Sequence, residues 1–459
     1  MLTFFLKNII NKIQNKSFHH KGDDENLTIK IAKKNNSLRN LLRYARQYSP
    51  WYKKLLKDVP IESISYEDLS DLPTLTKHTL MDNWDEIVTD RSLNLKKVMH
   101  HLDKMNYTDE IIPLDEKYIV FSTGGSSGRK GILVREIENY RKAVYYTNLN
   151  VKKKMYELIK LEKNEKIRTV QVIITNAVYM MHARAKIYKP EDEIIYHLPI
   201  NQPIDEIVKK LNDIQPHRII ALPSTIYYLC LSVRSGDLRI KPNIITVGAE
   251  PLFPPIKRLI YETWPHVKLF NIYGATEGIV AQSCFCDNNY MHIYDQGGII
   301  SPVDKFNRSV EMNGYSDKLI FTNFSNYTLP LINYEIDDRL RFVSKTCSCG
   351  STFPLIEEPK GRPANDFFYP DNIMIHHLIF VTPLLTDGHV VEYQVTQTRQ
   401  GAIIKIVSSG PVKKDNIINK ICEDYLKLGI KDAQIKIIDV PQLEYLHSGK
   451  MRRFICLQN

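Results

Sequence analysis

Residues 167–175 have the sequence IRTVQVIIT, and further short apolar runs follow before residue 275. These runs are EIIYHL (193–198), HRIIALP (217–223), NIITVG (243–248) and VKLFNIYG (267–274). Helical patterns separate them near residues 178–186, 205–214, 224–235 and 253–263. Strands that alternate with helices at this spacing are typical of βαβ units. The sequence therefore predicts a parallel sheet covered by helices on both faces.

The flanks of this alternating stretch have a different character. Residues 38–160 show mostly helical patterns, whereas strand-like runs prevail beyond residue 290. A small α+β segment follows Gly361-Arg362-Pro363. We therefore predict an α/β fold with a large multi-layer domain of mixed and parallel sheets over 1–362. A small α+β domain over 363–459 follows a hinge near 362–366.

The composition indicates a globular protein. Of 459 residues, 43% are hydrophobic and 25% are charged, which excludes fibrous and disordered classes. No apolar run reaches the ~20 residues that a transmembrane segment needs. Seven cysteines without a secretory signal favour a reduced, cytoplasmic setting. Residues 1–54 contain 12 Lys and Arg against 3 Asp and Glu and thus hold most of the net charge of +10, so no nucleic-acid partner is expected.

The N-terminal residues have a basic amphipathic pattern. Apolar residues recur at helical spacing from Leu2 to Ile13, with Lys7, Lys12 and Lys16 between and after them. Such a helix usually packs on its own domain. Contact with an anionic membrane surface or an acidic partner is the alternative.

A loop rich in glycine and hydroxyl groups, STGGSSGRKG (122–131), lies between two short apolar runs. Glycines let the backbone approach a polyanion, hydroxyl and N–H groups can hold phosphate oxygens, and Lys130 adds positive charge. It is not a Walker loop, because no Ser or Thr follows Lys130. A flexible turn is the alternative. The expected phosphate-binding residues are Ser122, Thr123, Gly124, Gly125, Ser126, Ser127, Gly128 and Lys130.

A second polar segment, NIYGATEG (271–278), ends the last strand of the alternating stretch. Open α/β sheets bind ligands at the carboxyl ends of their strands. Glu277 is therefore a candidate Mg²⁺ ligand, Thr276 can hydrogen-bond a phosphoryl or carboxyl oxygen, and Tyr273 can stack on a base. A solvated turn is the alternative.

A third segment, LINYEIDDR (331–339), is followed by KGR (360–362). Asp338 can accept both hydroxyl groups of a ribose, as acidic residues do in dinucleotide sites. Arg362 can reach the same sugar or a phosphate. Two adjacent aspartates otherwise often form a solvated turn.

In their order and spacing these segments resemble the adenylate-forming superfamily of acyl- and aryl-CoA synthetases, and within it the phenylacetate-CoA ligase-like branch. YARQYSPWYKKL (44–55), VGAEPL (247–252), CSCGS (347–351) and GRPANDFF (361–368) extend the resemblance over most of the chain. It implies that 1–362 is an adenylation domain and 363–459 a mobile lid. It also adds to the nucleotide site Gly248, Ala249, Glu250, Asn271, Gly274 and Ala275.

The resemblance implies a two-step reaction with ATP, Mg²⁺ and a thiol. A carboxylate attacks the α-phosphorus of ATP to give an acyl-adenylate and pyrophosphate, and the thiol, usually coenzyme A, then displaces AMP. Lys450, in SGKMRR (448–453), matches the family's adenylation lysine. With Thr276 and Glu277 it makes up the expected catalytic set.

The chain departs from the family pattern at several positions. Arg129 stands where proline is common, and Ile336-Asp337 replaces the Thr-Gly of the ribose motif. The hinge motif is one residue longer, so Asp366 is an uncertain counterpart of the hinge residue. These changes weaken the expectation for thioester formation more than the expectation for adenylation.

Soft ligands in the C-terminal half of the large domain suggest a structural zinc site. Cys347 and Cys349 form a Cys-x-Cys pair before a glycine, and the spacing of Cys286 and His292 matches a relative in the family. Four nitrogen and sulfur ligands describe structural zinc. Cys284 could replace Cys286, and reduced buried thiols are the alternative. Cys230, Cys422 and Cys456 are expected in the core.

The acid and the acceptor stay open at this point. Pocket candidates are Tyr179, His182, Gly248, Ala249 and Asn271, although Tyr179 and His182 could be core residues. The acceptor could instead be an acyl-carrier protein's phosphopantetheine, or a hydroxyl group that receives AMP without a thioester. A silent scaffold protein is a further alternative, which the intact Lys130, Glu277, Asp338 and Lys450 oppose. A monomer and a homodimer are both compatible with the sequence.

Overall fold

The structure is a computed structural model. It describes residues 27–105, 108, 110–123, 131–159, 161, 165–173, 177, 179–200, 202–249, 252, 254–283, 290–345, 347–349, 351, 353–359, 367–370, 373–375, 377, 379–380, 383–384, 387, 389–408, 410–441, 443 and 454–457. Among these residues no helix has the length and apolar character required to cross a membrane.

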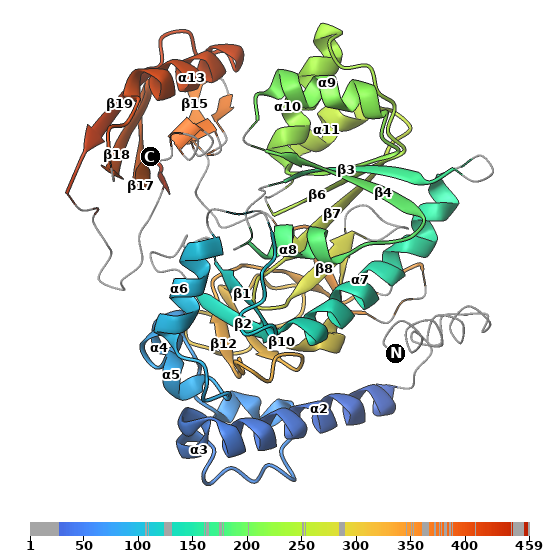
Figure 1. Cartoon of the computed structure of the whole chain (residues 1–459), viewed down its shortest axis with the longest axis vertical. Coiled ribbons are helices and arrows are strands. Elements are labelled where there is room, and N and C mark those ends of the chain that lie inside the picture. The colour runs from blue at the N-terminus through green and yellow to red at the C-terminus, as the bar shows by residue number, and fades with distance from the viewer. Residues whose placement is uncertain are drawn as a thin grey trace.

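A nine-stranded sheet forms the centre of the large domain (Figure 1). Its first five strands are parallel, in the order β4 (Glu193–Pro199), β3 (Ile167–Ile173), β5 (Arg218–Ala221), β6 (Ile244–Gly248) and β7 (Lys268–Gly274). Four antiparallel strands extend it: β8 (Val280–Ser283), β9 (Tyr290–Ile293), β14 (Leu355–Glu357) and β13 (Phe342–Val343). The predicted alternating α/β stretch is confirmed, and the sheet is mixed because later strands add to its edge.

Helices cover both faces of the parallel part. Figure 1 shows α9 (Ile204–Ile214), α10 (Pro223–Ser235) and α11 (Pro254–Thr263) on one face, and α7 (Ile137–Leu158) and α8 (Met180–Ile187) toward the other. The apolar face of α9 supplies Ile207, Val208 and Leu211 to the core between the helices and the sheet. Gln215, at φ 49°, takes the left-handed conformation that ends this helix.

A second layer lies below that sheet in Figure 1. It contains a hairpin of β1 (Tyr118–Ser122) and β2 (Ile132–Glu136), and a three-stranded sheet of β10 (Gly298–Val303), β11 (Lys318–Asn323) and β12 (Tyr334–Ile336). The N-terminal helices α2 (Leu27–Tyr48), α3 (Pro50–Leu55), α4 (Lys77–Asp82), α5 (Trp84–Ile87) and α6 (Leu95–Met105) share its core. Short 3₁₀ turns occur at η1 (Glu67–Asp71) and η2 (Asp295–Gly297).

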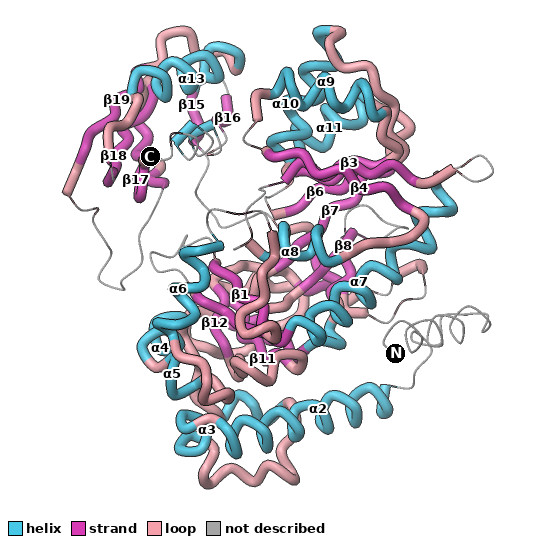
Figure 2. The backbone as a smooth tube through the Cα atoms, in the orientation of Figure 1, coloured by secondary structure: helices cyan, strands magenta, loops and turns pink. Residues whose placement is uncertain are grey.

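The C-terminal part has a sheet and a core of its own (Figure 2). The sheet has the order β19 (Gln434–Asp439), β18 (Gly401–Ser408), β17 (Val390–Thr398) and β20 (Phe454–Ile455). The C-terminal part also contains helix α13 (Lys414–Lys427) and a separate hairpin of β15 (Phe367–Tyr369) and β16 (Ile373–Ile375). Helix α13 ends at Lys427, shortly before Gly429, which adopts φ +102°.

Candidate functional site

The β1–β2 hairpin closes the predicted phosphate loop at its base. Ser122 pairs with Ile132, and the backbone N–H of Thr123 donates to the carbonyl of Gly131 over 2.9 Å. The Thr123 hydroxyl accepts a return bond of 2.8 Å from the Gly131 N–H. Thr123 and Gly131 are therefore tied together at the base of the predicted loop.

The carboxyl ends of β6 and β7 bring several predicted residues together. Gly248 pairs with Ile272, so the segment that starts at Ala249 leaves the sheet beside Tyr273. A Cβ atom at position 248 would lie 2.7 Å from the Ile272 carbonyl oxygen, which explains the glycine. Ala249 has φ +65°, an unfavourable conformation for alanine that functional sites often hold.

A hydrogen bond joins two nucleotide-site segments that are remote in the sequence. The Tyr273 hydroxyl donates to Oδ2 of Asp338 over 2.8 Å, across 65 residues of chain. Tyr273 lies at the end of β7, and Asp338 follows β12. The predicted base-side and ribose-side residues are thus neighbours at one edge of the sheet.

The turn after β7 presents Thr276 and Glu277. The carbonyl of Ala275 accepts a hydrogen bond of 2.9 Å from the Gly278 N–H, and the Ala275 N–H donates to the Ile279 carbonyl over 3.0 Å. These two bonds close the turn. Glu277 is 9% exposed. Its carboxylate therefore lies largely out of solvent, where it interacts with nearby groups more strongly than in water.

Tyr334 introduces a buried hydroxyl near this turn. Its side chain is 1% exposed, and the hydroxyl has no hydrogen-bond partner among the described residues. Burial first, and then the charges of Glu277 and Asp337, raise its pKa well above the usual range. Tyr334 therefore stays a neutral phenol next to the acidic groups of the site.

Several predicted site residues lie outside the described residues. They are Gly124, Gly125, Ser126, Ser127, Gly128, Lys130, Glu250, Arg362, Lys450, Cys286 and the uncertain hinge residue Asp366. Their roles stay predictions.

The residues proposed to line the acid pocket are mostly buried. His182 in α8 is fully buried and Asn271 is 4% exposed, whereas Tyr179 is half-buried against the core. Two arginines that the sequence analysis missed lie near these elements, Arg135 on β2 and Arg184 on α8. Burial lowers the pKa of each. Nothing in the spacing of the sequence marks either one, since both lie within ordinary strand and helix patterns.

Three of the four predicted zinc ligands meet at the antiparallel edge of the sheet. The sulfur of Cys349 lies 3.3 Å from Nε2 of His292 and 3.2 Å from the sulfur of Cys347. His292 lies on β9, and the cysteines lie in the turn between β13 and β14. Their donor atoms all lie within 4.8 Å of one another, close enough to bind one ion.

The remaining described cysteines are in packing positions. Cys230 is fully buried, as predicted, and burial raises its pKa to about 11. Cys422 and Cys456 are only half-buried, so the prediction of full core positions was wrong for them. Both lie at the margin of the small C-terminal core, which cannot enclose every side chain of its surface helix and edge strand.

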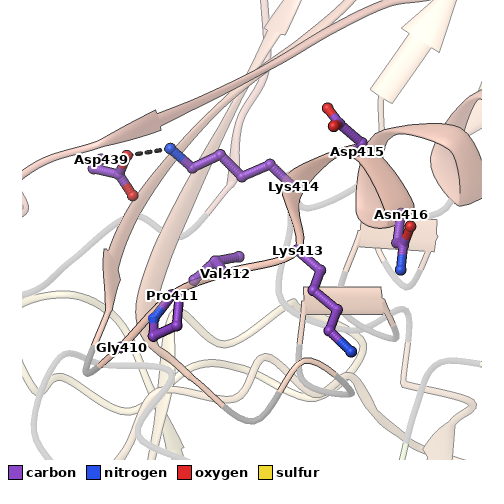
Figure 3. Close-up of a pocket in the computed structure, with 8 residues that line it drawn as sticks. All are labelled: Gly410, Pro411, Val412, Lys413, Lys414, Asp415, Asn416 and Asp439. Carbon is purple, nitrogen blue, oxygen red and sulfur yellow. Dashed lines mark hydrogen bonds and ion pairs between the residues drawn. The ribbon is translucent and has the colours of Figure 1, made fainter.

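A separate cavity of about 710 Å³ lies on the C-terminal part, where the chain enters α13 (Figure 3). Its lining includes Lys413, Lys414, Asp415 and Asp439, and Lys414 forms an ion pair with Asp439. None of those predicted site residues that the structure describes lines it.

Comparison with known proteins gave two curated relatives. A phenylacetate-coenzyme A ligase of Thermus thermophilus is 25% identical over 203 residues, which cover 43% of this chain and 45% of that protein. The match thus spans less than half of the relative's length. Protein CapK of Staphylococcus aureus is 21% identical over 84% of this chain and 80% of its own. The chain matches no protein-family model.

Solved structures share the fold over nearly the full chain. A 2-hydroxyisobutyryl-CoA ligase, solved with 2-HIB-AMP and CoA in the thioesterification state, superposes with a TM-score of 0.61 at 15% identity. The match covers 96% of this chain and 94% of that one. An open conformation of the same ligase gives a TM-score of 0.58 and covers 96% of both chains.

Proposed function

We propose that this chain is a phenylacetate-CoA ligase-like member of the adenylate-forming superfamily, and that it activates a small carboxylic acid with ATP and transfers the acyl group to coenzyme A. The observation that carries the proposal is the Tyr273–Asp338 hydrogen bond of 2.8 Å. It joins the expected base and ribose contacts at the carboxyl edge of β7, where open α/β sheets bind ligands.

The first step forms an acyl-adenylate. An oxygen of the acid's carboxylate attacks the α-phosphorus, the bond from that phosphorus to the bridging oxygen breaks, and pyrophosphate leaves. Negative charge grows on the oxygens around the phosphorus and on the leaving pyrophosphate, so we assign Lys130 and Lys450 to its stabilisation. Asp338 would hold the ribose, and Thr276 would donate to a phosphoryl oxygen, which fixes the reacting atoms in place.

Glu277 fits the role of a Mg²⁺ ligand. It is a carboxylate, 9% exposed, in the turn that follows β7. In nucleotide sites Mg²⁺ is usually held by one or two carboxylates together with substrate phosphates. When bound, the ion supplies charge neutralisation at the phosphate oxygens.

The second step transfers the acyl group. The thiolate of coenzyme A attacks the acyl carbon, the bond from that carbon to the phosphate oxygen of the adenylate breaks, and AMP leaves. We propose that residues 363–459 form the lid that moves between the two steps, with its boundary at residue 362. The separate hydrophobic core within residues 367–454 supports this boundary, because a part with its own core can move as a body.

Acid-dependent exchange of pyrophosphate into ATP tests the proposal. We expect exchange with at least one small carboxylic acid, and we expect Lys450→Ala to reduce it by about 100-fold or more, as the loss of one charge-stabilising donor does. Lys431→Ala, which removes an exposed lysine of the same C-terminal part, is the matched control and should exchange like the wild type.

The results also separate the alternatives. No exchange with any acid would favour the scaffold function, and full activity of Lys450→Ala would remove this lysine from the mechanism. The product mass then distinguishes a CoA thioester from an acylated carrier protein or an adenylylated alcohol.

We propose a structural Zn²⁺ at His292, Cys347 and Cys349. Imidazole and thiolate donors are the ligands that zinc prefers, and the three donor atoms already lie within 4.8 Å of one another. Cys286, which precedes β9, would complete the tetrahedral set. The ion would join β9 to the β13–β14 turn and so hold the antiparallel edge of the sheet.

Metal analysis of the purified chain tests the zinc site. We expect about one zinc per chain, and we expect Cys347→Ser to lose it, because structural sites need all of their ligands. Cys422→Ser is the control, since Cys422 is a half-buried residue of α13 in the C-terminal part, and this change should leave the zinc content unchanged. A wild-type chain without zinc would contradict the site.

A further inference from the structure

Asn323, the last residue of β11, contacts the turn that carries Glu277. Its side chain is 1% exposed, and its amide nitrogen donates to the backbone carbonyl of Glu277 over 2.5 Å. Its own backbone N–H donates to the Leu331 carbonyl at 3.0 Å. The amide is therefore anchored to a strand and directed at the peptide unit of the candidate magnesium ligand.

The other end of the same amide is fixed by Ser325. Oδ1 of Asn323 accepts from the Ser325 N–H at 2.7 Å and from the Ser325 hydroxyl at 2.8 Å. The oxygen and nitrogen of an amide group are assigned from their hydrogen-bond partners. Because both groups of Ser325 donate hydrogen bonds, the oxygen of Asn323 must face Ser325 and its NH₂ group must face Glu277. The orientation of Asn323 is thus determined by the network.

A buried cation completes this network. Nη2 of Arg135 donates to the Ser325 hydroxyl at 2.5 Å, and the Arg135 side chain is 5% exposed. Because that hydroxyl accepts from a guanidinium, its own hydrogen is free to donate to Asn323. The chain of hydrogen bonds therefore runs from Arg135 through Ser325 and Asn323 to the carbonyl of Glu277.

Gly278 leaves room for this contact. It has φ +124°, and a Cβ atom there would lie 2.6 Å from the amide nitrogen of Asn323. Any larger residue would both strain the backbone and push the amide away from Glu277. The absence of a side chain at Gly278 therefore makes space for the amide group of Asn323.

We propose that Asn323 is a positioning residue that orients Glu277 for Mg²⁺·ATP, with Ser325 and Arg135 holding Asn323 in place. The inference rests on the proposed function, in which Glu277 binds the ion. The amide acts on the backbone of Glu277, and the direction of the Cα–Cβ bond follows the peptide plane. A shift of that carbonyl would therefore move the carboxylate.

Binding of a non-hydrolysable ATP analogue, measured by calorimetry with and without Mg²⁺, tests this role. Asn323→Asp keeps the shape of the side chain but replaces the donor by an acceptor that repels the Glu277 carbonyl. We expect it to weaken Mg²⁺-dependent binding by about tenfold or more, as is usual for groups that orient metal ligands. Binding without Mg²⁺ should stay as in the wild type.

Asn326→Asp is the matched control. Asn326 is also a buried asparagine, 3% exposed, and its amide donates to a backbone carbonyl, that of Val134, over 3.0 Å. Its oxygen accepts from the Leu329 N–H at 3.4 Å, so the hydrogen bonds given by the structure for this side chain go to Val134 and Leu329. We expect this variant to lose thermal stability while its Mg²⁺ dependence stays that of the wild type.

The outcomes separate this inference from the proposed function. Unchanged Mg²⁺-dependent binding in a folded Asn323→Asp variant would overturn it, as would an equal loss with and without Mg²⁺, which marks a merely structural role. If that variant does not fold, Ser325→Ala at a half-buried position should shift Mg²⁺ dependence in the same direction, and no shift would overturn the inference. A wild-type chain without Mg²⁺-dependent nucleotide binding would instead remove the proposed function itself.

Discussion

Asp90 anchors the strand that leads to the phosphate loop. The Tyr118 hydroxyl on β1 donates a hydrogen bond to the Asp90 carboxylate, which also accepts from the Ser92 hydroxyl at 2.7 Å. These bonds, that of Tyr118 first, hold the pKa of Asp90 well below its usual range. Tyr118 is 2% exposed, so its hydroxyl depends on this partner.

The depressed pKa predicts acid-sensitive stability. A carboxylate of this kind stabilises the fold above its unfolded pKa of ~3.9 and loses that contribution as the pH falls further. Asp90→Asn should therefore cost about 1 kcal/mol at pH 7, and its difference from the wild type should shrink below pH ~4. Thermal unfolding of the variant and the wild type at pH 7 and at a pH below ~4 measures this difference. Asp71→Asn, which changes an exposed aspartate, is the control. A difference that is the same at both pH values would contradict the assignment.

At the scale of elements, α2 shows how the described part of the basic N-terminal region packs on the large domain. Leu38, Leu41, Leu42 and Ala45 form its buried face. Its cations have partners on other elements: Lys34 pairs with Asp295, and Nε of Arg43 donates to Glu62 at 2.7 Å. The exposed Arg43–Glu62 pair contributes little to stability. This part of the basic region therefore packs on its own domain, whereas the helix predicted from Leu2 to Lys16 lies outside the described residues.

The strands and helices of the central sheet show what local sequence can predict and what it cannot. The strand and helix patterns between 167 and 274 each correspond to an observed element, because the periodicity of apolar residues is a local property. The order of the sheet strands is not local, since β9 pairs with β14 across a long stretch of chain. The alternation therefore predicted the parallel strands but not the antiparallel edge that carries the proposed zinc ligands.

At the scale of the whole molecule, a hydrogen bond joins α10 of the large domain to α13 of the C-terminal part. The Tyr228 hydroxyl donates to Oδ2 of Asp424 over 3.1 Å, and Asp424 is 4% exposed. Burial first, and then Asp424, raise the pKa of Tyr228 above its usual range. The tyrosine therefore remains a neutral donor to a buried carboxylate.

We expect Tyr228→Phe to weaken the contact between the two parts. A hydrogen bond to a charged group contributes about 1.5–3 kcal/mol, so its loss should shift the population toward separated arrangements. Small-angle X-ray scattering should then give a larger radius of gyration without a change in secondary structure. Tyr227→Phe, which alters the adjacent half-buried ring in α10, is the control. Equal radii for Tyr228→Phe and wild type would show that this bond does not hold the arrangement.

The sequence by itself determined the alternating strands and helices and the polar segments that follow the strands, because both depend on residues that are close along the chain. Only the tertiary structure decided which of these segments meet. Tyr273 reaches Asp338 across 65 residues, Cys349 reaches His292 across 57, and Asn323 reaches Glu277 across 46. Such contacts depend on strand order, register and the packing of one layer on another, and no local pattern specifies these.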